Sequence, residues 1–298
     1  MFQMCFWVMV ALAVQGFQEP SGDLDKITLE LRCPKGEFTQ DQVVPLVIAL
    51  KNAPDGKVAQ LTLNPALPLG VELYWESPRT IKSRIVFLHE RRRAAPIAVE
   101  LQPGAKIQAL AFCSPCIFKE VPHAISEFKL PDIGEWKFWG VYASKNSIIK
   151  SEVIKVRITI LPSGGGSHPL ASESWHRFAL GDQRVTKEKI NELKDVFRTD
   201  RTGAQWDVLG YLLGLNEEEN ERYEEASVYY RELLAREPTN VAKSQVLLKL
   251  GKVLPRLGRY DEALILLDQV KPQEAEGSAE ELKKLRNTIE ELKRKSNK

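Results

Sequence analysis

Histidine and cysteine are scarce in this 298-residue sequence, with four of each. The histidines are scattered at 89, 123, 168 and 176, and none has the H-E-x-x-H spacing that places two zinc ligands on one helix face. The sequence also has no G-x-S-x-G nucleophile elbow, no Walker loop and no G-x-G-x-x-G dinucleotide motif. These absences predict a protein that is not an enzyme and that binds no metal or small-molecule cofactor.

A strong net charge is also missing. The 42 basic and 40 acidic residues leave a formal charge of +2, and neither half of the chain is strongly basic. Domains that bind nucleic acid usually carry a concentrated basic patch, so we expect no nucleic-acid partner. The densest basic stretch, 89–93, is more typical of a solvated hairpin tip than of a site for an anionic ligand.

Long hydrophobic runs are absent too, since none reaches the roughly 18 residues of a membrane helix. A short uncharged apolar run, Phe6 to Ala13, is followed by small or polar residues. This pattern is typical of a secretory signal peptide, although residues 1–5 contain no lysine or arginine. We therefore expect a signal peptide at 1–17 and a secreted or periplasmic protein without stable membrane insertion. The alternative is a buried apolar N-terminal strand.

Between Asp25 and Leu161, the dominant spacing of apolar residues is every second position, as at 27–32, 71–76 and 154–160. This period predicts strands with one buried face, and turn-forming residues such as those at 54–56 separate them. About eight short strands with no helical pattern between them favour two antiparallel sheets packed face to face, with a closed barrel as the alternative. The expected strands are 27–31, 43–50, 71–75, 85–88, 97–101, 106–112, 136–142 and 154–160.

Three stretches of this region resemble bacterial extracellular immunoglobulin-like domains, including those related to proteinase-inhibitor and macroglobulin-type sandwiches. They are KGEFTQDQVVPLVIALKN at 35–52, LQPGAKI at 101–107, and LPDIGEWKFWGVYAS at 130–144, which runs into SEVIKVRITI. In that family a late Pro-x-x-Gly turn precedes an aromatic-rich strand that pairs with the last strand. The resemblance implies an immunoglobulin-like β-sandwich over residues 24–162 and implies no activity.

The few cysteines leave several pairings open. Removal of Cys5 with the signal peptide would leave Cys33, Cys113 and Cys116. The C-x-x-C spacing of the last two permits a loop-stabilising disulfide or a redox pair, and Cys33 is the alternative disulfide partner. Redox motifs of this kind usually belong to a βαβ unit, whereas this one follows a strand. We favour a structural Cys113–Cys116 disulfide, with inert thiols, a metal site and redox chemistry as alternatives.

After residue 162 the pattern changes to that of helices. Residues 163–170 contain three consecutive glycines and predict a flexible linker rather than a phosphate-binding loop. Beyond it, RYEEA at 222–226 recurs as RYDEA at 259–263, and LLG at 212–214 recurs as KLG at 249–251. Both motifs are displaced by 37 residues (222 to 259 and 214 to 251), which indicates two copies of one helical hairpin.

These copies resemble the tetratricopeptide repeat, in which Leu-Gly lies in the first helix and Tyr and Ala begin the second. Glycine and alanine fit where paired helices cross closely, so we interpret them as packing residues. The displacement exceeds the usual ~34 residues and implies a longer turn near 240–243. The matching residues are Leu213, Gly214, Tyr223, Ala226, Tyr230 and Pro238 in the first copy, and Leu250, Gly251, Tyr260, Ala263 and Leu267 in the second.

The resemblance implies an all-α tetratricopeptide-like domain over residues 171–298. Degenerate helices are expected within 174–197, because such arrays usually need about three units for stability. At the other end, a capping helix is expected at 279–295, with Ser278 as its N-cap. Its apolar stripe should cover the last repeat and consists of Leu282, Leu285, Ile289 and Leu292.

In that repeat family, the first helices of the hairpins line a concave groove that accepts an extended peptide or a partner helix. Their mixed apolar and polar character here suits a peptide, but contact with the sandwich or with flanking helices is an equal alternative. They lack the Lys and Asn of the carboxylate clamp, so a chaperone C-terminus is not the expected ligand. The corresponding positions are Val208, Tyr211, Leu215, Gln245, Leu248 and Lys252.

Three functional classes remain. The favoured hypothesis is a non-enzymatic extracytoplasmic scaffold or adaptor that binds a protein or peptide through the helical groove. The second is a proteinase-inhibitor-like or substrate-binding accessory module, suggested by the resemblance of the sandwich. The third is a thiol–disulfide exchange enzyme that uses Cys113 and Cys116.

Overall fold

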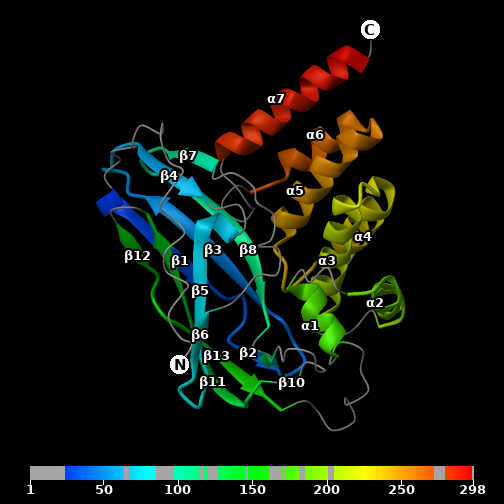
Figure 1. Cartoon of the computed structure of the whole chain (residues 1–298). Coiled ribbons are helices and arrows are strands. Elements are labelled where there is room, and N and C mark those ends of the chain that lie inside the picture. Colours follow the sequence, from blue (N-terminus) through cyan, green and yellow to red (C-terminus); the bar gives the residue numbers. More distant parts are fainter. Residues whose placement is uncertain are drawn as a thin grey trace, which may run out of the picture.

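The structure is a computed structural model in which a β-rich region and a helical region lie side by side (Figure 1). This division agrees with the expectation of two domains. The predicted signal peptide and residues 163–169 of the predicted linker lie outside the described residues. The residues described are 24–63, 67–84, 97–114, 117–119, 127–129, 131–144, 147–160, 170, 172–180, 185–200, 205–271 and 279–296.

Seven strands of the β-rich region lie on segments that were predicted as strands: β1, β3, β5, β7, β8, β11 and β13. The expected strand at 85–88 lies outside the described residues. β4 alternates over its five residues but was not predicted. The other strands are three residues long, too short to show a period of two. The strands are β1 (Ile27–Arg32), β2 (Glu37–Thr39), β3 (Val44–Asn52), β4 (Ala59–Leu63), β5 (Val71–Glu76), β6 (Lys82–Arg84), β7 (Ile97–Leu101), β8 (Lys106–Cys113), β9 (Ile117–Lys119), β10 (Glu127–Lys129), β11 (Gly134–Ala143), β12 (Ile148–Lys150) and β13 (Ile154–Thr159).

The described strands form two larger sheets and two strand pairs. One sheet has three strands in the order β1-β3-β8, and the other has six, in the order β2-β13-β11-β5-β6 with β12 also paired to β11. The strand pairs are β4 with β7 and β9 with β10. Pairing is antiparallel except between β2 and β13, which run parallel, so the expectation of purely antiparallel sheets was wrong at this edge.

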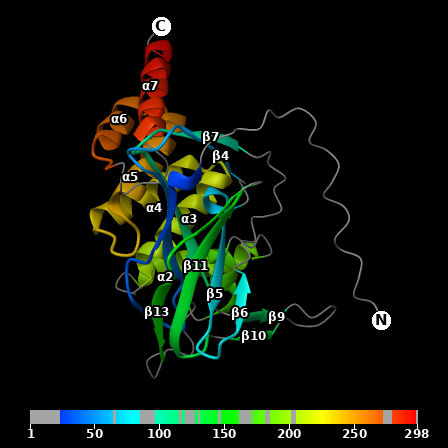
Figure 2. The same ribbon diagram turned by 90° about the vertical axis from the view of Figure 1, so that its left-hand side faces the viewer.

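The two larger sheets share one hydrophobic core. Leu29 of β1 and Ile48 of β3 are buried in the same cluster as Trp136 and Phe138 of β11 and Val156 of β13. Burying side chains of both inner faces in this way is what holds two sheets together. In Figure 2 the six-stranded sheet faces the viewer and the helices lie behind, so the three-stranded sheet has a neighbour on each face.

The helical region consists of seven α-helices among the described residues. Two of them begin with the hydroxyl caps that favour helix starts, because Ser172 accepts a hydrogen bond from the backbone of Trp175 and Thr186 one from Lys189. None of the described helices is both long enough and apolar enough to cross a membrane. The helices are α1 (Glu173–Ala179), α2 (Lys187–Thr199), α3 (Trp206–Glu219), α4 (Tyr223–Ala235), α5 (Lys243–Val253), α6 (Tyr260–Asp268) and α7 (Ala279–Ser296).

Candidate functional site

The two copies of the sequence repeat form the hairpins α3–α4 and α5–α6. At the crossing of each hairpin, a β-carbon on Gly214 would lie 2.5 Å from Cε1 of Tyr230, and one on Gly251 would lie 2.5 Å from Cδ2 of Leu267. Carbon atoms in contact normally stand about 3.5–4.0 Å apart, so no larger residue fits without movement. The prediction that these glycines are packing residues is confirmed.

The turn between the hairpins is held by a buried carboxylate that the sequence did not reveal. Asp207, near the start of α3, accepts hydrogen bonds from the backbone of Thr239 at 2.8 Å and from the backbone and side chain of Asn240. Backbone N–H groups bonded to a carboxylate stabilise a loop that would otherwise leave them unsatisfied. Asp207 therefore fixes the long turn that separates the two copies by 37 rather than ~34 residues.

Further helices flank the hairpins, as expected. α1 and α2 precede them, and α7 packs on α6, with Leu282 and Ile289 buried. Arg286 of α7 donates a 2.6 Å hydrogen bond to the carbonyl of Leu267, the kind of contact that satisfies a helix C-terminus. The end of the predicted stripe departs from expectation, because Leu292 is 41% exposed where α7 extends past α6 (Figure 1).

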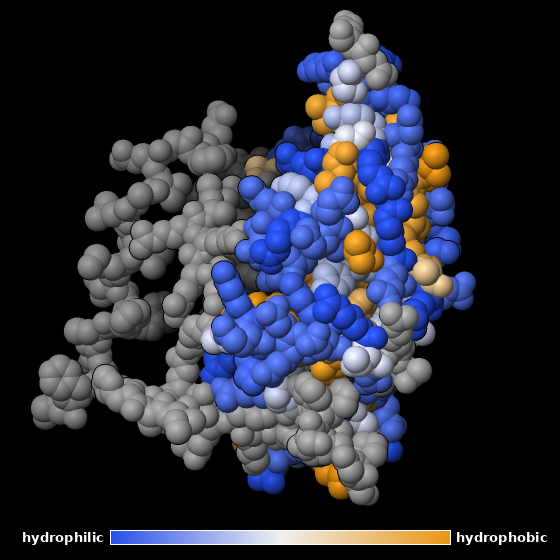
Figure 3. Space-filling model, turned by 90° about the vertical axis from the view of Figure 1, so that its right-hand side faces the viewer, coloured by the Kyte–Doolittle hydropathy of each residue, from blue (hydrophilic) through white to orange (hydrophobic). Residues whose placement is uncertain are grey.

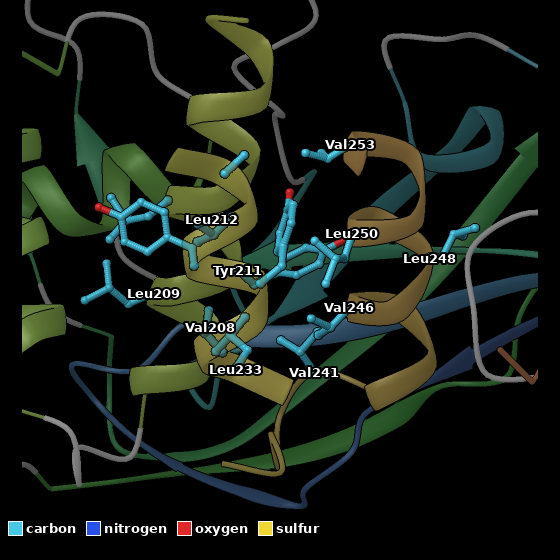
Figure 4. Close-up of a cluster of buried hydrophobic side chains, with 14 of the residues drawn as sticks. Val208, Leu209, Tyr211, Leu212, Leu233, Val241, Val246, Leu248, Leu250 and Val253 are labelled. Atoms are coloured by element: carbon cyan, nitrogen blue, oxygen red, sulfur yellow. The ribbon is translucent and has the colours of Figure 1, made fainter. Parts of the chain in front are cut away.

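Most of the six predicted groove positions are buried. Val208, Tyr211, Gln245 and Leu248 are each 3% exposed or less. In Figure 4, Tyr211 and Val208 point from α3 toward α5, whereas Leu248 points away from α3. Leu215 is half-buried against the helical core, and Lys252 is exposed. The face between α3 and α5 is thus lined by buried side chains with an exposed lysine nearby on α5.

Two residues of the β-rich region cover part of this face. Val43, just before β3, and Phe112 of β8 belong to the same buried cluster as the helices. The ring of Phe112 lies 5.9 Å from the ring of Tyr211, and Gln205 accepts a 3.0 Å hydrogen bond from the backbone of Val43. Burying two such side chains contributes about 3–6 kcal/mol. Contact with the β-rich region, one of the two alternatives for these positions, is therefore present at Tyr211.

A second polar contact joins the regions nearby. The hydroxyl of Ser114, at the end of β8, is 2.9 Å from Nδ1 of His176 in α1, and both residues are buried. Burial lowers the pKa of His176 from 6.5 to about 3, so the imidazole is neutral in the folded protein. This histidine therefore contributes packing and a neutral hydrogen bond to the contact between the regions.

The depressed pKa of His176 predicts a pH-dependent stability. In the unfolded chain the imidazole regains its ordinary pKa, so between about pH 6.5 and pH 3 the unfolded state binds more protons and stability falls as the pH falls. Lowering the pH from about 7 to about 5 is expected to remove about 2 kcal/mol through this group. Urea unfolding of the wild type and of His176→Gln at both pH values measures it. Equal pH dependence in the two proteins would contradict the assignment.

The predicted disulfide between Cys113 and Cys116 involves a residue outside the described part of the chain. Cys33 and Cys113 are free thiols, and Cys116 lies outside the described residues. The side chain of Cys113 is buried in the core between the sheets, and burial raises its pKa well above the usual range. Burial also raises the pKa of Cys33 to about 11. Thiol exchange needs a readily formed thiolate, so the surroundings of these two cysteines oppose that chemistry.

The outer side of the helical region is largely hydrophilic, with hydrophobic residues spread singly (Figure 3). Val228 of α4 is 59% exposed and Ile265 of α6 is 61% exposed. They occupy the same position in the two repeat copies, 37 residues apart (228 to 265). Isolated exposed side chains of this kind are normal on soluble proteins.

Comparison with known proteins supports the repeat. A model of the tetratricopeptide repeat matches residues 218–288, from the end of α3 into α7. The helical region therefore contains a tetratricopeptide repeat, which suggests a protein-interaction module. No curated protein matches the chain in sequence.

Three similar solved structures have TM-scores below 0.5 and share little of their architecture with this chain. A β-glucosidase from Erythrobacter marinus is 14% identical with a TM-score of 0.29, and the match covers 45% of this chain and 15% of that one. A Listeria innocua β-glucosidase in complex with isofagomine is 14% identical with a TM-score of 0.28, covering 45% and 16%. The sporulation control protein Spo0M from Bacillus subtilis is 10% identical with a TM-score of 0.25, covering 57% and 55%. This chain thus matches less than two thirds of the length of each.

Proposed function

We propose that this protein is a non-enzymatic scaffold that works outside the cytoplasm and whose helical repeats bind a protein or peptide partner. The proposal places it in the secreted or periplasmic space, with no nucleic-acid partner, no cofactor and no stable membrane insertion. The β-rich region, proposed as an immunoglobulin-like sandwich, serves as the support on which the repeats are mounted.

One observation carries the proposal: the face between α3 and α5 already buries a side chain from another part of the chain. Phe112 packs there against Tyr211, whose hydroxyl accepts a 3.1 Å hydrogen bond from Gln245. At protein interfaces, most of the binding energy comes from a few residues, and these are often aromatic side chains buried in a water-free pocket. The inner face of the repeats is therefore suited to holding polypeptide.

Site-specific photocrosslinking tests this function without disturbing a buried contact. A photoreactive amino acid replaces exposed Lys252, on the same helix as Gln245, in the full chain, and the matched control carries it at exposed Val228 on the outer side. We expect a protein adduct from position 252 in the extracytoplasmic fraction and none from position 228. Adducts from position 228 alone, or from neither position, would reject partner binding at this face.

The other two hypotheses receive less support. Thiol exchange through Cys113 is opposed by the burial that raises its pKa. The inhibitor-like or accessory-module hypothesis rests on the sequence resemblance of the sandwich, and no contact among the described residues adds to it. Titration of the Cys113 thiol in the native protein, with Cys113→Ser as the reference, separates the exchange enzyme from the scaffold, because a thiol buried in a core reacts only on unfolding.

A further inference from the structure

We infer that the end of β8 plugs the inner face of the repeats, and that a partner binds there by displacing the plug with an extended segment carrying a bulky aromatic side chain. The plug is defined as Val43 and Phe112. The inference rests on the proposed interaction function and adds to it both the class of ligand and a closed resting state.

The plug is set apart from its neighbours by the alternation of the strands. Ala111 and Cys113, on either side of Phe112, point into the core between the two sheets, and so does Val44, next to Val43. Phe112 and Val43 are the buried side chains of the β-rich region in the cluster of the helices, and partly buried Leu110 of β8 packs against that cluster. Two buried side chains at one end of the three-stranded sheet thus enter the helical region, while their sequence neighbours stay in the core between the sheets.

The seat of the plug shows which ligand it fits. Phe112 packs against the ring of Tyr211, and the ring of Tyr230, 6.2 Å away, packs against Tyr211 in turn, so the anchor position has an aromatic contact. Beside it, Gln205 binds a backbone N–H, that of Val43, rather than a side chain. Aromatic lining with main-chain recognition selects an extended segment with a large uncharged anchor residue.

The plug is separable from the core that it caps. The other buried hydrophobic residues of the helical cluster come from 170–289, so the repeats keep their own core without it. Contacts between regions of one chain resemble transient interfaces unless they are large and hydrophobic. When a binding site is free of its plug in only a fraction of the molecules, the apparent affinity of a ligand is the intrinsic affinity multiplied by that fraction. Removing Phe112 should therefore strengthen the binding of an added ligand.

The test uses the full chain and a defined probe. A fluorescent peptide with the sequence of residues 106–114, carrying Cys113→Ser, is titrated against the wild type and Phe112→Ala, with anisotropy as the readout. We expect Phe112→Ala to bind it at least about tenfold more tightly than the wild type. The same peptide with Phe112→Ala should bind at least about tenfold more weakly to that variant.

The matched control is Trp139→Ala in the six-stranded sheet, which shortens an aromatic residue of β11 that stacks on Tyr74 of the neighbouring strand β5. It should bind the peptide as weakly as the wild type. Equal binding by the wild type and Phe112→Ala, or binding by neither, would overturn the inference.

Circular dichroism checks that the variants fold, and Phe112→Leu serves as a second variant that keeps an apolar side chain. Unfolding of both variants would also overturn the inference, because the plug would then be part of one indivisible core. The peptide titration tests the plug, and photocrosslinking tests the proposed function, so either experiment can fail without the other. Binding of the peptide without any adduct at position 252 would reject the proposed function and keep the seat, whereas an adduct without peptide binding would reject the plug alone.

Discussion

Replacing Trp136 with alanine is expected to lower the free energy of unfolding by about 4 kcal/mol. This side chain is 1% exposed in the core between the sheets. Its ring centre lies 4.9 Å from that of Trp75, and its indole N–H donates a 2.7 Å hydrogen bond to the carbonyl of Asp132. Alanine would leave a large cavity and an unsatisfied carbonyl, and both effects destabilise the folded state. Urea unfolding followed by circular dichroism measures the loss.

The same strand supplies the control. Trp139, three residues further along β11, faces outward, is half-buried, and stacks on Tyr74 with ring centres 5.7 Å apart. A cross-strand pair of this kind contributes about 1 kcal/mol or less, so Trp139→Ala should cost correspondingly little. Similar losses for the two tryptophans would contradict the assignment of one dry and one open face to the six-stranded sheet.

Local patterns were sufficient to predict the longer elements. β1 and β13 each show an alternation of apolar and polar residues over six residues, long enough for a period of two to be read. The hairpins were marked by motifs repeated at one displacement, and the structure places Gly214 and Gly251 at equivalent crossings. A three-residue strand such as β6 has no readable period, and its position follows from pairing with β5.

The closed state of the helical face could not be predicted from the repeat, because it depends on Phe112 meeting Tyr211 across 99 residues of sequence (112 to 211). One signal was nevertheless present. The stretches 43–50 and 109–113 are apolar almost throughout, with no alternation, and such strands are usually buried on both faces. That pattern indicates that something covers the outer face of β3 and β8, although it does not say what.

The polar residues of the site left no such signal. Gln205, Asp207 and His176 belong to no motif, and each acts through a partner that is distant in sequence: Val43, Asn240 and Ser114. A buried polar group must find a hydrogen-bond partner, but sequence does not identify that partner in advance. The contacts of Gln205 with Val43 and of His176 with Ser114 fix how the regions meet, and that of Asp207 fixes a turn within the helical region. The helical domain was therefore predictable, and its inner surface was not.

Gly214→Ala is expected to reduce the free energy of unfolding by about 2–3 kcal/mol, although alanine is the better helix former by about 1 kcal/mol. The added methyl group would meet the ring of Tyr230, which is fully buried and has little room to turn. Gly251→Ala should cost less, because the atoms that it meets are Cδ2 and Cγ of Leu267, which is equally buried but is an aliphatic side chain with other rotamers rather than a rigid ring. Urea unfolding of both variants measures the difference.

The second repeat has Leu267 where the first has Tyr230, which suggests a substitution that compensates for Gly214→Ala. Combining Gly214→Ala with Tyr230→Leu places the smaller side chain of the second hairpin opposite the new methyl group. We expect the double variant to lose at least about 1 kcal/mol less than the sum of the two single losses, which is the coupling of residues in contact. Additive losses would show that the ring of Tyr230 is not the reason why position 214 needs glycine. A Gly214→Ala variant as stable as the wild type would show that the helices cross less closely than the glycine contacts indicate.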